Sequence, residues 1–208
     1  SSFPRMAFER IIANHKLSKK NVGKICFYEK PFRAWLTIAK HTVKTNSLTN
    51  ELTRNYFKNV WKSSIIFEYH LSKLKELRSV PVDYCEHHLS HTLTSLFYKN
   101  NFPAVSLVVD GYGDRYCTSI HHIKSSDEIK QVWSSEYPNS IGLFYSAITD
   151  YLGFAVNEGE YKVMGLAAYG RPIYEDKLKK TIQITKDNEL IVDTSYFDYV
   201  RSIKQTYS

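Results

Sequence analysis

Between residues 104 and 153 the sequence carries three strand patterns followed by one helix pattern, and this order constrains the fold more than any other feature. Residues 104–110 form an apolar run that stops at the glycine-containing turn 111–114, and an extended pattern resumes at 115–123. Two such runs around a short turn predict a β-hairpin, and residues 129–136 predict a third strand. Ser140 then begins an amphipathic helix, and Gly153 stands where a left-handed residue would end it.

The first half of the chain alternates helical patterns with short extended runs, which predicts a layered α/β architecture. An aromatic helical face that includes Tyr56 and Trp61 falls inside a long, mostly helical region. Before residue 104 we expect helices at 4–13 and 86–98, strands at 22–28 and 80–85, and the mostly helical region at 31–77. After residue 153 we expect a loop at 157–170, a short helix at 174–182 and a strand at 190–192.

Strand, strand, strand, helix is the opening of a ribonuclease-H-like unit, so we expect two subdomains. Residues 1–103 form the first, with the helical insertion 31–77 and the helix 86–98, and residues 104–208 form the second. On this division the first subdomain lacks its initial strands and the second lacks its end.

Composition favours a globular cytoplasmic protein. No apolar run has the length of a membrane span, and the first residues lack the basic and apolar regions of a signal peptide, so a membrane is not an expected partner. The three cysteines, Cys26, Cys85 and Cys117, form no CxxC pair, which argues against a disulfide framework and against a thiolate zinc site.

The positive charge is local. The chain has a formal charge of +7, but residues 16–78 alone carry 14 Lys and Arg against 4 Asp and Glu. Lysines spread along a helical region are typical of a solvated face. Nucleic-acid binding would require a recognisable reading motif among these charges, and the sequence has none, so nucleic acid is not an expected partner.

Two histidines at the start of the helix 86–98 form the strongest candidate site. On a helical wheel of about 100° per residue, His91 lies about 40° from His87, whereas Leu93 and Phe97 belong to an apolar stripe on another side. An i,i+4 histidine pair on one face is a common part of a metal site, although such pairs also occur on solvated helices. His88 lies at about 100° and should point away from the metal.

Asp110 is the candidate third ligand, because it ends an apolar strand where open α/β sites gather. Two imidazoles and a carboxylate suit iron, zinc or manganese and leave positions open for a substrate oxygen. The zinc-protease motif is excluded, since His88 stands where that motif has its glutamate.

Two glycine-containing segments could bind phosphate or carbamoyl groups. Gly111 and Gly113 offer unobstructed backbone N–H groups, although a tight hairpin also requires glycine. In the segment 159–170, Lys162 could neutralise a phosphate or polarise a carbonyl, with Gly165 beside it, or it could be a surface lysine of a loop.

The order and spacing of these motifs strongly resemble the O-carbamoyltransferases of nodulation-factor and antibiotic tailoring. The resemblance is carried by residues 87–91, 107–111, 140–146, 151–154 and 159–170, and it extends to the start of the chain through residues 2–4 and 27–31. It covers nearly all 208 residues.

The resemblance implies the N-terminal, actin-like domain of an ATP-dependent enzyme with a mixed sheet and flanking helices. In such enzymes a C-terminal domain of the same chain makes carbamoyl-adenylate from carbamoyl phosphate and ATP, and the N-terminal domain moves the carbamoyl group to a hydroxyl of a small molecule or sugar. His87, His91 and Asp110 would hold the divalent metal, with Fe²⁺ expected and Zn²⁺ or Mn²⁺ as alternatives. Gly111, Gly113, Lys162 and Gly165 would contact the nucleotide or carbamoyl group. Without its missing parts the chain is expected to be inactive alone.

Three questions stay open at this point. The same fold could serve a tRNA threonylcarbamoylation-type enzyme, or a non-catalytic actin-like nucleotide-binding module whose histidines are surface residues. The catalytic base is unknown, with His88 a candidate by proximity alone. A homodimer is also open.

Overall fold

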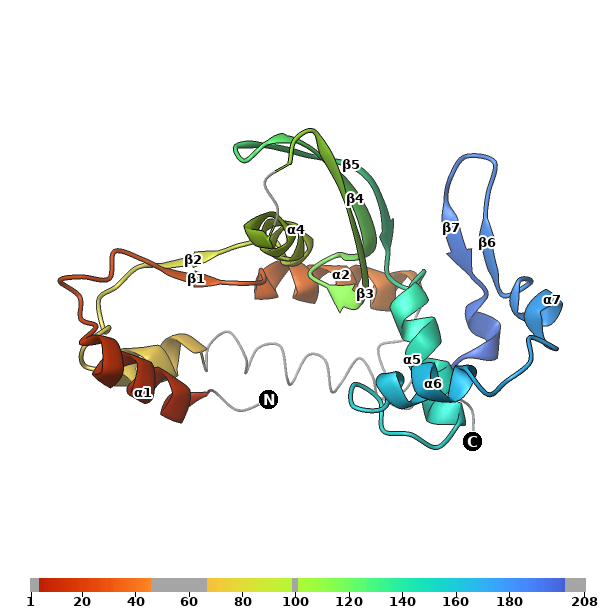
Figure 1. Cartoon of the computed structure of the whole chain (residues 1–208), viewed down its shortest axis with the longest axis horizontal. Coiled ribbons are helices and arrows are strands. Elements are labelled where there is room, and N and C mark those ends of the chain that lie inside the picture. The colour runs from red at the N-terminus through yellow and green to blue at the C-terminus, as the bar shows by residue number, and fades with distance from the viewer. Residues whose placement is uncertain (1–3, 46–66, 99–100, 201–208) are drawn as a thin grey trace.

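The computed structural model describes residues 4–45, 67–98 and 101–200, and these form a mixed α/β fold drawn out along one axis (Figure 1). A parallel pair of strands lies at one end, a three-stranded antiparallel sheet in the middle and a short hairpin at the other end. In chain order the elements are α1 (Arg5–His15), β1 (Ile25–Phe27), α2 (Pro31–Lys44), β2 (Val82–Tyr84), α4 (His87–Tyr98), β3 (Ala104–Gly113), β4 (Tyr116–Ser125), β5 (Glu128–Glu136), α5 (Ile141–Tyr151), α6 (Glu160–Ala167), α7 (Glu175–Leu178), β6 (Ile182–Ile184) and β7 (Leu190–Val192).

The predicted order of three strands and a helix is confirmed. Strands β3, β4 and β5 pair antiparallel in that order, and α5 packs against β3. The Ser140 hydroxyl accepts a hydrogen bond from the Leu143 N–H at 3.0 Å, which satisfies one of the free donors at the start of α5. Gly153 follows the helix with a φ of 81°, a conformation that glycine adopts without strain.

The hairpin turn lies later than the sequence predicted. Strand β3 continues to Gly113, with a register shift after Val109, and the chain reverses at Asp114, whose φ is 52°. A bulge of this kind inserts residues into one strand and bends it, so the glycines that indicated a turn lie inside the strand instead.

The expected loop at 157–170 is wrong, because the segment contains helix α6. The Glu160 carboxylate accepts hydrogen bonds from the Asn157 N–H at 2.9 Å and the Gly159 N–H at 3.2 Å, and these bonds fix the turn that begins the helix. Glycine content suggested a loop, but it does not exclude a helix that packs against a neighbour.

Other expectations differ in length or fall outside the described ranges. The strand expected at 22–28 is limited to β1, and β6 pairs with β7 although no pattern in the sequence indicated β6. Within the region 31–77, helix α2 and the helical residues 67–73 agree with the expectation. Residues 46–66, with the predicted aromatic face of Tyr56 and Trp61, lie outside the described residues.

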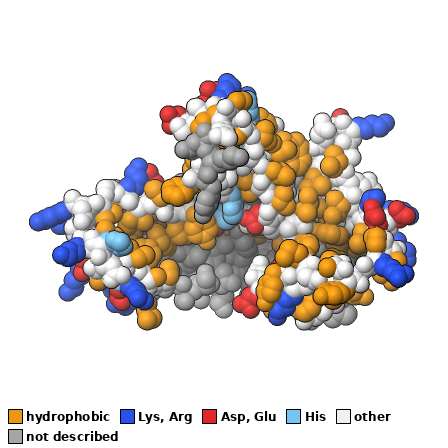
Figure 2. Space-filling model, in the orientation of Figure 1, with side chains coloured by type: hydrophobic (Ala, Val, Ile, Leu, Met, Phe, Trp, Pro, Cys, Tyr) orange, Lys and Arg blue, Asp and Glu red, His pale blue; other side chains and the backbone are white. Residues whose placement is uncertain are grey.

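Two separate hydrophobic clusters lie at the ends of the molecule. The first packs α1 against residues 67–80, around Ile12, Phe67 and Leu71, and the second packs α5 against β7, around Ala147 and Val192. Among the described strands, β3 lies at the edge of its sheet and exposes alternate apolar side chains, and hydrophobic atoms cover this part of the surface in Figure 2. Within the three described ranges, no helix is both long enough and apolar enough to cross a membrane.

Candidate metal centre

The side chains of His87, His91 and Asp110 converge at the junction of α4 and β3. Their donor atoms all lie within 4.8 Å of one another. The His87 Nε2 atom is 2.8 Å from Asp110 Oδ2 and 3.0 Å from His91 Nε2, and His91 Nε2 is 3.6 Å from Asp110 Oδ2. Figure 2 shows histidine atoms reaching the surface near the middle of this face, beside an acidic side chain.

These spacings fit three ligands of one ion. Ligands about 2.1 Å from a metal lie about 3.0 Å apart in an octahedral arrangement and about 3.4 Å apart in a tetrahedral one. The three measured separations fall around these values, and two imidazoles with one carboxylate are a donor set for iron, zinc or manganese. His91 is the exposed member, with a side chain 52% accessible, so its side leaves room for a substrate oxygen.

The electrostatics favour an ionised carboxylate at this site. The hydrogen bond from His87, together with the Gly111 N–H that Asp110 Oδ1 accepts at 2.6 Å, lowers the pKa of Asp110 to about 2. The same hydrogen bond to Asp110 raises the pKa of His87, against the opposing effect of burial. Asp110 would therefore bind a cation in its charged form, and His87 Nε2 would bind one only after losing the proton that it shares with Asp110.

Asp114 holds the first turn of α4 in place. Its buried carboxylate accepts hydrogen bonds from the His87 N–H at 2.8 Å and the Lys30 N–H at 2.7 Å. A carboxylate that accepts the first free N–H of a helix acts as a cap and also interacts favourably with the helix dipole. Asp114 thus joins the β3–β4 turn, the start of α4 and the segment before α2.

The buried face of α4 is polar, which corrects the apolar stripe that the sequence predicted. Leu93 and Phe97 are 43% and 88% exposed, whereas His88 and Thr92 are 2% and 0% exposed. The reason is that β4 presents polar partners to this face. The residues that pair are His88 Nδ1 with Ser119 Oγ at 2.7 Å and Thr92 Oγ1 with His121 Nδ1 at 3.2 Å.

His88 points away from the other two histidines, toward β4. Burial lowers its pKa to about 4, so the ring is neutral at pH 7. The side chain is 2% exposed and hydrogen-bonded to Ser119, so a substrate cannot reach it. His88 therefore supports the packing of α4 on β4 beneath the candidate ligands.

Gly111 and Gly113 lie at the site, and their contact with a nucleotide or carbamoyl group stays a prediction. The Gly111 N–H already donates to Asp110. A Cβ atom at residue 113 would lie 2.2 Å from the Cδ2 atom of His87, so glycine lets the imidazole ring lie directly on the strand. Both glycines therefore help to position the side chains of two candidate metal ligands, Asp110 and His87.

Lys162 and Gly165 lie on α6, which contacts α5. Both residues are exposed, and the Lys162 ammonium lies 5.9 Å from the ring centres of Phe154 and Tyr161. Among the described residues no contact joins Lys162 to the three candidate ligands, so its role as a nucleotide or carbamoyl contact stays a prediction.

Sequence reasoning missed three residues that shape the site. Asp114 lies in a predicted turn, and its partners Lys30 and His87 are distant in sequence, so no local pattern indicated its role. At Gly142 a Cβ would lie 2.4 Å from the Asp110 carbonyl oxygen, so glycine there lets α5 approach the end of β3. Glu29 is half-buried nearby, and burial, with a further contribution from Asp114, raises its pKa.

Comparison with known proteins identifies the family. The model of the carbamoyltransferase N-terminus matches residues 2–207. The chain belongs to this family. An uncharacterized protein of Synechocystis is 32% identical over 99% of this chain, and the chain covers 35% of that protein.

Shorter matches extend to rhizobia and archaea. The nodulation protein NolNO of Sinorhizobium fredii is 34% identical over 44% of this chain and 13% of its own length. An uncharacterized protein of Methanocaldococcus jannaschii is 35% identical over 55% of this chain and 22% of its own length. The chain thus spans about a third or less of the relatives it matches.

Proposed function

We propose that this chain is the domain of an ATP-dependent O-carbamoyltransferase in which the acceptor is carbamoylated. The enzyme moves a carbamoyl group from carbamoyl-adenylate to a hydroxyl of a small molecule or sugar. Family membership supports carbamoyl transfer. The observation that carries the rest is the convergence of His87, His91 and Asp110 at spacings that suit one divalent cation.

The chain's own residues would supply a preorganised site. Asp114 fixes the start of α4, Gly113 lets the His87 ring lie on β3, and Gly111 orients the Asp110 carboxylate. A bound Fe²⁺, Zn²⁺ or Mn²⁺ would act as a Lewis acid toward the carbamoyl carbonyl. The acceptor oxygen would form a bond to the carbamoyl carbon, AMP would leave, and the hydroxyl proton would pass to a base.

The proposed reaction requires further parts of the full-length protein. Other segments of the full-length chain would complete an actin-like fold. A C-terminal domain would form carbamoyl-adenylate from carbamoyl phosphate and ATP. We also propose a cytoplasmic location, where ATP and carbamoyl phosphate are available.

An assay with the full-length protein tests this function. Given carbamoyl phosphate, ATP and a panel of hydroxylated sugars, the protein should release AMP and form a carbamoylated product, and purified tRNA should not be modified. Asp110→Asn should abolish product formation and lower the bound metal. Modification of tRNA would favour the threonylcarbamoylation alternative, and undiminished transfer by Asp110→Asn would contradict the metal-assisted reaction.

A further inference from the structure

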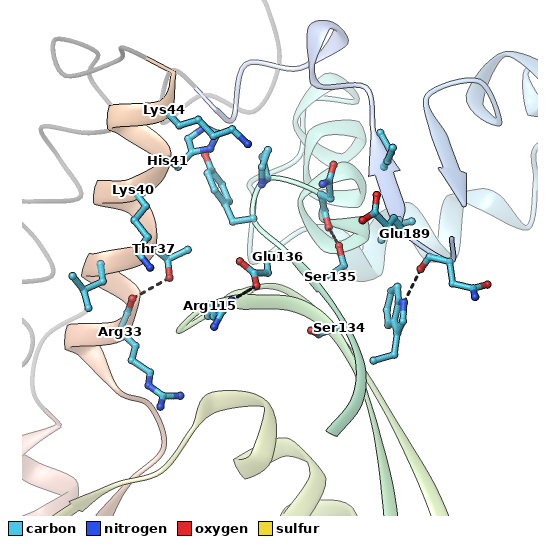
Figure 3. A pocket seen from close by; sticks show the side chains of 18 of the residues that line it. Arg33, Thr37, Lys40, His41, Lys44, Arg115, Ser134, Ser135, Glu136 and Glu189 are labelled. Carbon is cyan, nitrogen blue, oxygen red and sulfur yellow. Dashed lines mark hydrogen bonds and ion pairs between the residues drawn. The ribbon is translucent and has the colours of Figure 1, made fainter. Parts of the chain in front are cut away.

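A pocket of about 910 Å³ lies between α2, the end of β5 and the tip of the β6–β7 hairpin. Figure 3 shows the side chains of α2 along one wall, Arg115 and Glu136 at its base, and Glu189 on the hairpin opposite. Ligand sites of drug-sized and cofactor-sized molecules have volumes of about 300–1,000 Å³, so this pocket has room for a ligand such as a disaccharide.

The α2 wall is positively charged. Arg33, Lys40 and Lys44 follow one another at helical spacing and line the pocket, with His41 between the two lysines. Arg33 is neutralised by an ion pair with Glu86. Neither lysine takes part in an ion pair among the described residues, and two ammonium groups one helical turn apart repel each other, so an anion between them would be stabilised.

The opposite wall carries two carboxylates among polar and apolar side chains. Asp187 and Glu189 flank the tip of the β6–β7 hairpin, and Trp133 Nε1 donates to the Asn188 carbonyl at 2.7 Å, which attaches this tip to β5. Ionised carboxylates are hydrogen-bond acceptors, so hydroxyl groups of a ligand could donate to them. The indole of Trp133 adds an apolar surface.

Strand pairing connects the pocket to the candidate metal centre, although none of the three candidate ligands lines the pocket. Gly113 pairs with Tyr116, and Tyr116 pairs with Glu136, so Glu136 lies two strand spacings, about 10 Å, from the glycine under His87. At the other end, Arg33 bonds to Glu86, the residue before His87. A ligand in the pocket could therefore extend a hydroxyl toward the metal centre.

We propose that this pocket binds the acceptor, and that the acceptor is a polyhydroxylated molecule with an acidic group, such as a uronate or a phosphorylated sugar. The acidic group lies at Lys40 and Lys44, and hydroxyls donate to the carboxylates of the hairpin. This assignment of a substrate class rests on the proposed carbamoyl transfer, but the binding itself does not require the reaction.

Calorimetry on the full-length protein tests the proposal, with digalacturonate, maltose and inorganic phosphate as separate probes. Digalacturonate should bind roughly tenfold or more tightly than maltose, because two charge-assisted contacts are added. The double variant Lys40→Gln/Lys44→Gln should remove this preference. A matched control, Lys19→Gln/Lys20→Gln, changes two exposed lysines far from the pocket in sequence and should retain it.

Two further variants separate the pocket from the reaction. Asp187→Asn/Glu189→Gln should weaken the binding of maltose, which carries no charge. His91→Ala should abolish carbamoyl transfer, while the roughly tenfold preference for digalacturonate over maltose, which depends on the lysines, persists. If no carbamoyl transfer is detected but the Lys40→Gln/Lys44→Gln variant loses the preference for digalacturonate, only the proposed function is wrong. Equal affinity for the two disaccharides, unchanged binding in the lysine variant, or phosphate binding as tightly as digalacturonate would overturn the acidic-sugar site.

Discussion

At the scale of single residues, the site depends on close approach between α4 and β3. The His87 ring lies on Gly113, and its Nε2 atom faces both Asp110 and His91. His88, next to it in sequence, faces β4 instead. Substitutions of His87 and His88 should therefore have different effects on metal binding, although the two residues are adjacent in the helix. The same holds for a glycine in contact with a candidate ligand and a glycine with no such contact.

Gly113→Ala should weaken metal binding roughly 10- to 100-fold, because the new methyl group would displace the His87 ring. It should also destabilise the protein by about 1–3 kcal/mol through overpacking. Gly165→Ala is the matched control. Among the described residues no neighbouring atom lies within 4 Å of the position that its methyl group would take in α6, and alanine there should stabilise the helix by about 0.5–1 kcal/mol. Metal titration and urea unfolding measure both quantities, and equal metal affinity in the two variants would show that the contact is unimportant.

His91→Ala and His88→Ala should give opposite results. His91 is half exposed, so its loss should remove most of the bound metal and cost little stability. His88 is buried and bonded to Ser119, so its loss should retain the metal but lower the free energy of unfolding by about 1–3 kcal/mol. Metal content by elemental analysis and thermal unfolding of the metal-free protein distinguish the two. Comparable metal loss in both variants would contradict the geometry.

At the scale of elements, the central sheet and its helix were predictable because their signals are local. Each signal specifies the local structure of a few adjacent residues, and the structure confirms all three: the apolar strand 104–110, the Ser140 cap and Gly153 after the helix. The buried face of α4 was not predictable in this way. Hydrophobicity selected Leu93 and Phe97, but Ser119 and His121, about 30 residues away, determine which face is buried. Asp114 was missed for the same reason, since its partners at Lys30 and His87 are distant in sequence.

Asp114→Ala should weaken the attachment of α4 and lower the free energy of unfolding by about 0.5–2 kcal/mol, the usual cost of losing a helix cap. Asp114→Asn keeps one carboxamide oxygen for one of the two N–H donors and should cost less. The ranking of the three proteins by denaturant midpoint checks this. An alanine variant as stable as the wild type would mean that water replaces the carboxylate without cost.

At the scale of the whole molecule, two hydrophobic clusters at the ends are joined by a central layer made of α2, α4 and the β3–β5 sheet. This layer buries polar side chains as well as apolar ones such as Val108 and Ile123. The layer contains neutral histidines as well as hydroxyls. Burial lowers the pKa of His121, which is 4% exposed, and burial followed by the charge of Lys44 lowers that of His41. The central layer should therefore be the part of the fold most sensitive to acid.

The stability of the metal-free protein should fall as the pH is lowered below about 6.5, the ordinary value for histidine. A histidine with a lowered pKa in the fold is protonated more readily in the unfolded chain, so each such group makes unfolding take up as much as one proton in this range. His87 has a raised pKa and the opposite sign, but its stabilising contribution is complete below about pH 6.5 and changes only at higher pH.

His121→Gln keeps a hydrogen-bonding group for Thr92 and cannot titrate. The slope of unfolding free energy against pH between about 6.5 and 5 should therefore be smaller by as much as one proton, about 1.4 kcal/mol per pH unit at most. Urea unfolding at several pH values, with a chelator present, measures the slope. An identical slope in the variant would show that His121 is not a neutral group of the folded central layer.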